Sequence, residues 1–219
     1  MPSSNPTKKT YDDLTTAYDF FNERLFDGKL PRCLITMQRK NKSYGYFAGG
    51  RFGTQDGEEI TDEIALNPSH FKTRTTEQNL STLVHEMVHL WQHHSGEKQS
   101  RSGYHNKEWG TMMKVIGLIP SDTGAEGGKE TGQHVSHYIE VGGAFDRACA
   151  ELVTLGFEVP YVELWAEGEE KTRKKKAASK TKYTCPGCGL NAWAKPAVVL
   201  LCGECEVGLV AEEGEGEAA

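Results

Sequence analysis

Long apolar segments are missing from this 219-residue sequence. The longest apolar run, residues 197–202, has six residues, whereas roughly 20 are needed to cross a bilayer. Residues 1–10 are polar and lack the apolar core of a secretory signal. We therefore expect a cytoplasmic protein that has no membrane span and whose six cysteines are reduced.

Acidic residues are missing from a strongly basic stretch that begins at residue 171. Residues 171–202 carry eight Lys and Arg and no Asp or Glu, whereas residues 203–219 carry six Glu. The whole chain has a net charge of −6, which argues against a surface coated with nucleic-acid-binding charge. A local contact of the basic stretch with nucleic acid remains compatible with this charge. Hydrophobic residues at 37% and charged residues at 26% are typical of a folded globular chain.

Hydrophobic periodicity predicts an α+β fold with a small antiparallel or mixed sheet packed on helices. The expected helices are residues 11–26, 77–94, 106–117 and 144–155, and the expected strands are residues 34–37, 44–52, 59–66 and 135–141. Residues 119–133 are expected to form an exposed loop, either a plain connection or a lid over a substrate. The predicted organisation is a disordered N-terminus (1–10), a main domain (11–165), a charged linker (166–182), a small cysteine module (183–210) and an acidic disordered tail (211–219).

The segment His85-Glu86-Met87-Val88-His89 is an H-E-x-x-H motif on the predicted helix 77–94. Helical spacing puts two imidazoles one turn apart, where they can bind zinc while Glu86 reaches a water on the metal. The apolar stripe of this helix lies nearly opposite His85 and His89, which predicts that they face a cleft. The alternative is a surface helix with two hydrogen-bonded histidines.

A hydrolytic zinc needs a third protein ligand. The metzincin pattern is excluded, because it requires Gly and His where this chain has Gln92 and Ser95. His93 and His94 are too far along the helix, and we expect them at the solvent edge and packed, respectively. His105 and Glu108 remain; we favour His105 and expect Glu108 to support a ligand or cap a helix.

Four cysteines form two C-x2-C pairs, Cys185/Cys188 and Cys202/Cys205, separated by thirteen residues. This spacing predicts a closed four-cysteine zinc site, and such a small module would take most of its folding free energy from the metal. A thioredoxin-like redox pair is the alternative. Cys33 and Cys149 are lone cysteines that we expect to be packed.

With these motifs in place, the chain resembles the SprT-like zinc metallopeptidases, the family that includes the Spartan-type DNA-dependent proteases. Tyr18–Pro31 is similar to the family's opening helix and turn, and Leu83–His89 to its zinc helix. Gly103–Trp109 is similar to its third-ligand segment, which supports His105, and residues 183–205 to its C-terminal zinc ribbon. Residues 119–160 are closer to a bacterial or mobile-element branch.

The resemblance implies a zincin-like endopeptidase domain followed by a zinc ribbon, with one catalytic and one structural Zn²⁺. It implies hydrolysis of peptide bonds in protein substrates held near DNA, such as DNA–protein crosslinks. Glu86 would act as general base toward a zinc-activated water. The donor that stabilises the oxyanion stays open among Tyr104, Tyr138, His134 and His137.

Contact with single-stranded or distorted DNA would fall to basic and aromatic side chains near the cysteine module, which neutralise phosphates or stack on bases. These are Lys171, Arg173, Lys174, Lys175, Lys176, Lys180, Lys182, Tyr183, Trp193 and Lys195. The run can also be a solvated linker, in which case the peptidase is indifferent to DNA. A different class of function is a non-catalytic zinc-ribbon DNA-binding or adaptor protein whose H-E-x-x-H domain is only a scaffold.

Overall fold

A computed structural model describes residues 5–98, 100–101, 103–159, 161–164 and 181–212. The chain folds as two compact units, Met1–Gly168 and Glu169–Ala219. The first unit combines helices with small sheets, which confirms the predicted α+β class. No helix in the described ranges is both long and apolar enough to span a membrane.

The main sheet of the first unit has three strands, β1 (Leu34–Met37), β2 (Gly45–Gly53) and β3 (Ile60–Leu66). Their order is β1-β3-β2, with β1 parallel and β2 antiparallel to the central β3. A register shift between Ala48 and Phe52 marks an irregularity in β2. The strands follow their predicted ranges within one residue, because each is a short β-branched or aromatic segment between turn residues.

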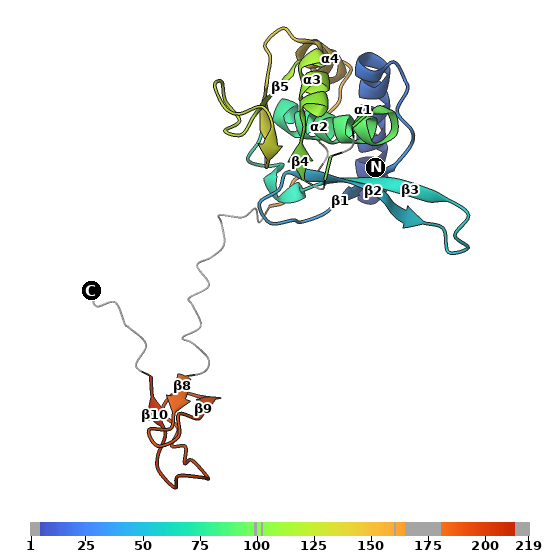
Figure 1. Ribbon diagram of the computed structural model, residues 1–219. Coiled ribbons are helices and arrows are strands. Elements are labelled where there is room, and N and C mark those ends of the chain that lie inside the picture. The colour runs from blue at the N-terminus through green and yellow to red at the C-terminus, as the bar shows by residue number, and fades with distance from the viewer. Residues whose placement is uncertain (1–4, 99, 102, 160, 165–180, 213–219) are drawn as a thin grey trace. The chain divides into compact units, whose positions relative to one another are not determined.

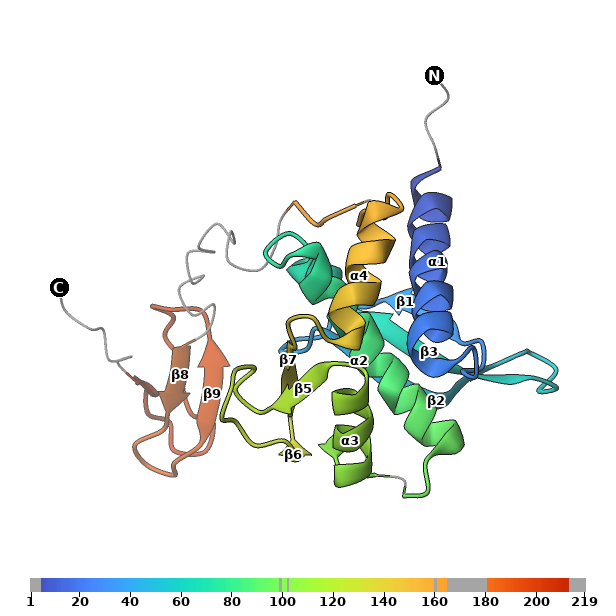
Figure 2. The same ribbon diagram turned by 90° about the horizontal axis from the view of Figure 1, so that it is seen from above.

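Four α-helices complete this unit: α1 (Pro6–Phe26), α2 (Thr76–Ser95), α3 (Lys107–Val115) and α4 (Ala144–Thr154). A short 3-10 helix, η1 (Pro68–His70), precedes α2. Figures 1 and 2 show α2 in the middle of the unit, between the sheet and the helices α3 and α4. The helix that carries the H-E-x-x-H motif is therefore the central element.

The first helix begins five residues earlier than expected, so the prediction of a disordered segment 1–10 is wrong for residues 6–10. Asn5 caps the helix by accepting a hydrogen bond from the Lys8 backbone N–H at 3.2 Å, and Pro6 occupies the first turn. Both features favour helix initiation. Residues 6–9 are exposed and Thr10 is buried, so the helix packs against the rest of the unit from its second turn onward.

Residues 118–139 contain three short strands, although a loop is expected from the sequence over residues 119–133. β5 (Leu118–Ser121) pairs antiparallel with β7 (Ser136–Ile139). β4 (Tyr104–His105) pairs antiparallel with β6 (Gly132–Gln133). The prediction of an exposed loop over 119–133 is therefore wrong at both ends, because pairing with segments distant in sequence stabilises these short strands.

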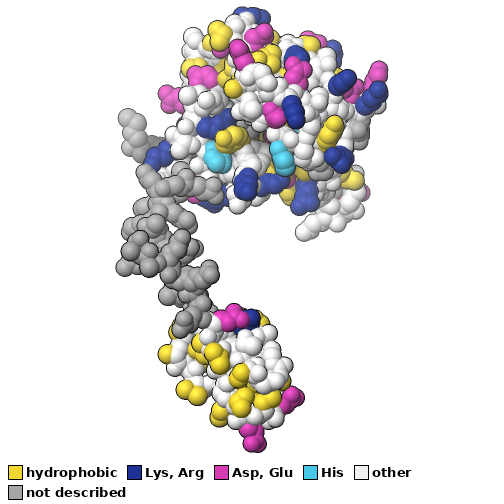
Figure 3. Space-filling model, turned by 60° about the vertical axis from the view of Figure 1, so that its left-hand side comes forward, with side chains coloured by type: hydrophobic (Ala, Val, Ile, Leu, Met, Phe, Trp, Pro, Cys, Tyr) yellow, Lys and Arg dark blue, Asp and Glu magenta, His cyan; other side chains and the backbone are white. Residues whose placement is uncertain are grey.

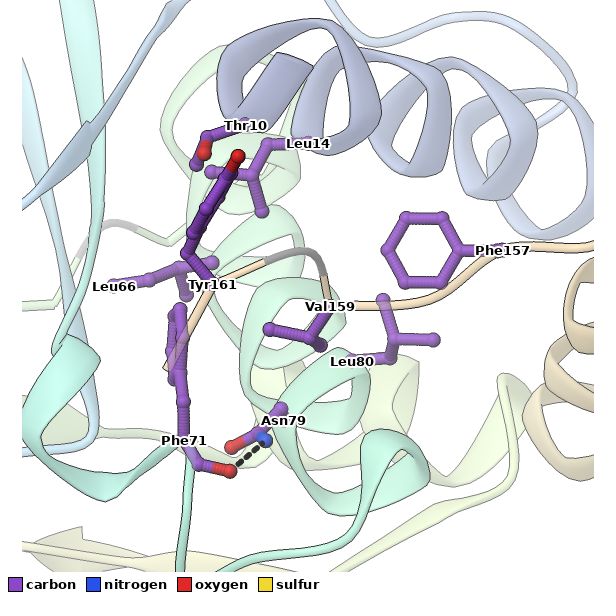
Figure 4. A pocket seen from close by; sticks show the side chains of 9 residues that line it. All are labelled: Thr10, Leu14, Leu66, Phe71, Asn79, Leu80, Phe157, Val159 and Tyr161. Carbon is purple, nitrogen blue, oxygen red and sulfur yellow. Dashed lines mark hydrogen bonds between the residues drawn. The ribbon is translucent and has the colours of Figure 1, made fainter. Parts of the chain in front are cut away.

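The core joins α1 to α4 and to the centre of α2. Phe21 of α1 stacks on Phe145 of α4 with ring centroids 5.5 Å apart, and both are fully buried. Phe157, Val159 and Tyr161 help to line a small cavity of about 10 Å³ against residues of α1 and α2 (Figure 4). Its lining is mainly apolar and contains none of the histidines of the motif: Thr10, Leu14, Leu66, Phe71, Asn79, Leu80, Phe157, Val159 and Tyr161.

The C-terminal unit contains β8 (Thr181–Thr184), β9 (Asn191–Ala194) and β10 (Val210–Ala211), ordered β10-β8-β9. The module thus begins two residues before the predicted start at 183, and β10 runs one residue past its predicted end. An ion pair between Lys182 and Glu212 accompanies this pairing. Of the predicted linker and acidic tail, residues 166–180 and 213–219 lie outside the described residues.

Candidate metal centre

Local sequence explains why α2 starts where it does. Thr75 and Gln78 form a capping box, in which Thr75 Oγ1 accepts from the Gln78 N–H at 3.2 Å and Gln78 Oε1 accepts from the Thr75 N–H at 3.1 Å. The helix then runs without interruption to Ser95. His85, Glu86 and His89 consequently lie on one continuous helix, as their spacing predicted.

The surroundings of α2 differ from the prediction of one buried and one open face. Every residue from Asn79 to Val88 is buried, including His85 and Glu86 with 9% and 5% exposure. The indole of Trp109 in α3 lies 4.9 Å from the His85 ring and 5.3 Å from the His89 ring, between centroids. The histidine face is covered because α2 is central, with α3 packed against it.

Three histidines come together at this face. The candidate ligand nitrogens of His85, His89 and His105 all lie within 4.8 Å of one another, and His89 Nε2 is 3.1 Å from His105 Nε2. His105 belongs to β4, and the next residue, Asn106, caps α3 by accepting from the Trp109 N–H at 3.0 Å. The group can hold a metal ion, and His105 occupies the place predicted for the third ligand.

Glu108, the other candidate for the third ligand, has a different role. Its carboxylate accepts from the backbone N–H groups of Glu97 at 2.7 Å and Lys98 at 3.1 Å, and from the side chain of Gln92 at 3.1 Å. Loss of hydration acts to raise the pKa of Glu108, but the hydrogen bonds from the Glu97 and Lys98 N–H groups and from Gln92 outweigh it and lower the pKa. Glu108 therefore closes the turn after α2 and is not part of the three-histidine group.

A fourth histidine orients the first ligand. Ser81 Oγ donates to the Gln78 carbonyl at 3.0 Å, which leaves it to accept from His137 Nε2–H at 2.9 Å. In a neutral imidazole the other nitrogen then has a lone pair, so His137 Nδ1 accepts from His85 Nδ1–H at 3.0 Å. This network assigns the lone pair of His85 to Nε2, the nitrogen left for a metal.

His105 is oriented through a backbone carbonyl. Its Nδ1 lies 3.4 Å from the carbonyl oxygen of Gly132 in β6, which leaves Nε2 directed at His89. Partners of this kind, on the far nitrogen of a histidine, orient metal ligands in general. Residues 118–139, whose purpose was unknown from the sequence, thus provide partners for His85 and His105. His137 was proposed as an oxyanion donor, but both of its ring nitrogens are already engaged.

Burial keeps these imidazoles neutral. Loss of hydration lowers the pKa of His89 to about 3, of His105 to about 4 and of His137 to about 3, and it moves the pKa of His85 well below its usual value. Only neutral imidazole donates a lone pair to a metal. At neutral pH the group is therefore in the protonation state that metal binding needs.

Glu86 is buried beside the edge strand β2. Burial raises its pKa to about 8, and the Phe47 backbone N–H and the charge of Lys40 only partly oppose this shift. Gly45 allows the strand to approach, because a Cβ there would lie 3.3 Å from Glu86 Oε1 and 2.8 Å from the Ala65 carbonyl oxygen. A carboxyl group with this pKa can exchange a proton near neutral pH.

The remaining candidates for an oxyanion donor have different surroundings. Tyr104 in β4 and Tyr138 in β7 are half-buried, and the guanidinium of Arg101 lies 5.1 Å from the Tyr104 ring centroid. His134 is exposed, and its backbone has a left-handed φ of 58°. Tyr104, Tyr138 and His134 therefore stay candidates.

The last turn of α2 holds His93 and His94, for which we expected a solvent-edge and a packed position. Their side chains are 37% and 41% exposed, so the expectation of a packed His94 is wrong. Both rings turn toward Asp62 of β3, with His94 Nε2 2.6 Å from Asp62 Oδ2. This pair is separate from the three-histidine group.

The C-terminal unit holds the second cluster. The sulfur atoms of Cys185, Cys188, Cys202 and Cys205 lie within 4.8 Å of one another, and none is in a disulfide. The Cys188 and Gly187 backbone N–H groups lower the pKa of Cys185 to about 7, with burial acting against them. These cysteines can hold a metal as thiolates. Burial raises the pKa of both Cys33 and Cys149 to about 12, which fits packed, unreactive thiols.

The residues expected to contact nucleic acid are only partly described. Lys171, Arg173, Lys174, Lys175, Lys176 and Lys180 lie outside the described residues. Tyr183 is buried and donates its hydroxyl to the Lys195 carbonyl at 2.9 Å, so the expectation that it stacks on bases is wrong. Trp193 is 61% exposed on β9, and Lys195 is exposed. Figure 3 shows hydrophobic side chains over the visible face of this unit, with few charges.

An α+β unit with a three-histidine group and a buried glutamate that directly follows the first of these histidines in the sequence, together with a four-cysteine unit, has the features of a metal-dependent protein. The sequence matches the SprT-like family over residues 14–127, and the chain belongs to that family. It is also 52% identical over 59 residues to an uncharacterized protein in the mucB 3' region of Salmonella typhimurium. Those residues are 27% of this chain and 80% of the relative, consistent with a bacterial or mobile-element branch. No solved structure matches the chain.

Proposed function

We propose that this chain is a zinc-dependent endopeptidase with a zincin-like domain. The observation that carries the proposal is the convergence of His85 and His89 of α2 with His105 of β4, with Glu86 directly after His85 on α2. Three neutral nitrogen ligands and one nearby carboxyl group are what zinc-assisted hydrolysis requires of a protein. Membership of the SprT-like family supports this reading.

The donor set fits zinc. All three ligands are imidazoles, a ligand type that zinc prefers, and the far nitrogens of His85 and His105 have acceptors that orient the rings. Trp109 packs against all three rings, at 4.9, 5.3 and 4.3 Å between centroids, and limits their rotation. The site is therefore preorganised for a cation.

Zinc, when bound, supplies a Lewis acid that acidifies water and polarises the scissile carbonyl. Glu86 takes a proton from the attacking water, whose oxygen bonds to the carbonyl carbon. Glu86 then gives the proton to the amine as the C–N bond breaks. Tyr104, Tyr138 or His134 would donate a hydrogen bond to the oxyanion.

We also propose that the C-terminal unit is a zinc ribbon that keeps the peptidase near DNA. Cys185, Cys188, Cys202 and Cys205 would hold a structural zinc, which a unit of this size needs for folding. The adjacent basic residues 171–182 and the exposed Trp193 would provide phosphate contacts and base stacking. The substrates would be proteins bound or crosslinked to DNA.

The test is cleavage of a DNA-binding protein by the full chain and by Glu86→Gln, with and without single-stranded DNA and with zinc measured in both preparations. We expect cleavage that DNA stimulates and that Glu86→Gln reduces by at least about 100-fold, the low end of general-base catalysis. Zinc content should not change. Glu86-dependent cleavage that ignores DNA would contradict the DNA proposal alone. No cleavage by fully zinc-loaded chain would indicate an adaptor protein.

A further inference from the structure

A third group of metal-ligating side chains lies at the end of α2, apart from the two clusters described above. Its members are Asp62, His93 and His94, whose ligand atoms all lie within 4.8 Å of one another. We propose that this group binds a divalent transition-metal ion, with zinc as the probe. The inference does not depend on peptidase activity, because it concerns neither Glu86 nor the three-histidine group.

Asp62 provides a rigid anionic ligand. Its side chain is only 8% exposed, and its Oδ1 accepts from the Gly50 backbone N–H at 2.7 Å. Gly50 lies in the irregular part of β2 and has a left-handed φ of 57°, which directs its N–H at Asp62. The carboxylate is therefore held in place from the sheet side, with its remaining lone pairs directed toward α2.

His93 and His94 provide two imidazoles from adjacent positions of the last helical turn. His94 Nε2 is 2.6 Å from Asp62 Oδ2, and His93 Nε2 is 3.9 Å from Asp62 Oδ1. The His93 ring packs on Gly49, where an added Cβ would lie 2.8 Å from the ring. Glycine at this position thus makes room for the imidazole beside the carboxylate.

The arrangement has the chemistry of a two-histidine, one-carboxylate site. Ligand atoms at about 2.0–2.1 Å from a tetrahedral zinc are about 3.4 Å apart. The 2.6 Å from His94 Nε2 to Asp62 Oδ2 and the 3.9 Å from His93 Nε2 to Asp62 Oδ1 lie on either side of that spacing. A simple ion pair between Asp62 and His94 would not require the imidazole of His93 beside the carboxylate. The two rings are 37% and 41% exposed, so water can complete the coordination. Mixed N and O ligands of this kind suit zinc, nickel or copper ions.

Such an ion would fasten the last turn of α2 to β3. The same helix carries His85 and His89, so the bound metal would restrain the helix that holds the first metal centre. A ligand that binds only the folded chain stabilises it, so zinc at this third site should raise the melting temperature.

The experiment is a calorimetric titration of zinc into full-length chain already loaded with two equivalents. We expect one further equivalent, with the imidazole resonances of His93 and His94 shifting together in the NMR spectrum. Asp62→Asn and His94→Gln should each weaken binding of this third zinc at least about 10-fold. Even the loss of a residue that only hydrogen-bonds to a metal ligand causes a decrease of this size. His70→Gln, a substitution of a histidine outside the group, should leave binding of the third zinc unchanged.

The exposed double variant His93→Gln/His94→Gln serves as a second test if Asp62→Asn fails to fold. It should retain two zinc equivalents and lose the third. The proposal is overturned if no third equivalent binds up to about 1 mM zinc, a very weak affinity for a specific site. It is also overturned if a third equivalent binds undiminished to the double variant, because the ion would then be held elsewhere.

Discussion

His137 shows how a residue that touches no metal can decide a metal site. Its ring joins His85 to Ser81 through hydrogen bonds of 3.0 and 2.9 Å, and loss of hydration together with the nearby charge of Arg74 lowers its pKa. We predict that His137→Leu weakens zinc binding at the three-histidine group by about 10–100-fold, because His85 loses its acceptor. Competition with a chelator of known affinity measures this loss, and the His85→Ala variant identifies the signal of the site.

Two matched variants separate orientation from packing. His137→Asn keeps an oxygen acceptor for His85 Nδ1–H, so its loss of affinity should be smaller than that of His137→Leu. His70→Asn changes a histidine that packs on Tyr44, away from the metal group, and should bind zinc normally. Equal losses in the Leu and Asn variants would contradict the orienting role.

At the scale of elements, the close approach of β2 to α2 depends on Gly45. A Cβ there would lie 2.8 Å from the Ala65 carbonyl oxygen and 2.9 Å from Thr82 Cγ2, and neither backbone nor a buried methyl group can easily move. We predict that Gly45→Ala lowers the free energy of unfolding by about 1–3 kcal/mol, the cost of overpacking. Denaturant unfolding monitored by circular dichroism measures it.

Gly110 provides the control with the opposite sign. It lies inside α3, and a Cβ there would meet its nearest neighbours at 3.6 and 3.8 Å, which is ordinary contact. Gly110→Ala should raise the free energy of unfolding by about 0.5–1 kcal/mol through helix propensity. A Gly110→Ala variant that is less stable than the unaltered chain, or a Gly45→Ala variant of unchanged stability, would contradict the packing described around these two glycines.

Elements with strong local patterns were predictable from the sequence, and elements that depend on distant contacts were not. The three strands of the main sheet and the capped helix α2 follow their predicted ranges within one residue. By contrast, β5 and β6 form by pairing across the chain. The role of His137 rests on contacts with His85 and Ser81, which lie 52 and 56 positions earlier in the sequence. No local sequence pattern reveals such contacts.

At the scale of the whole molecule, the buried histidines predict acid sensitivity of the metal-free chain. The pKa values of His85, His89, His105 and His137 are all lowered by burial, whereas in the unfolded chain they return to about 6.5. The unfolded state therefore binds more protons, and stability falls as pH drops from about 6.5 toward 4. Glu86 has a raised pKa and the opposite effect, but one group opposes four.

Denaturant unfolding in the presence of EDTA, followed by near-ultraviolet circular dichroism at several pH values, measures this dependence. The slope of the free energy of unfolding against pH should correspond to uptake of about three protons on unfolding near pH 5. Four histidines gain protons on unfolding and Glu86 loses one. His137→Leu should reduce the uptake by about one proton. A stability that does not change between about pH 7 and 5 would contradict the burial of these neutral imidazoles.

The division into two units makes a last prediction about metal content. His85 and Cys185 belong to different units and to different clusters, so each metal should depend only on its own ligands. His85→Ala should lose one zinc and the proposed peptidase activity while the C-terminal unit stays folded. Cys185→Ser should unfold the C-terminal unit, because so small a unit buries too little surface to fold without its metal.

Zinc analysis and amide NMR spectra of both variants measure this independence. Each variant should lose one equivalent of zinc relative to the unaltered chain, and only the resonances of the affected unit should collapse or shift. Peptidase activity without DNA should survive in Cys185→Ser, since Glu86 and the three histidines remain in place. If either substitution removed both metals, the two clusters would have to fold as one cooperative body, and the assignment of separate tasks to them would be wrong.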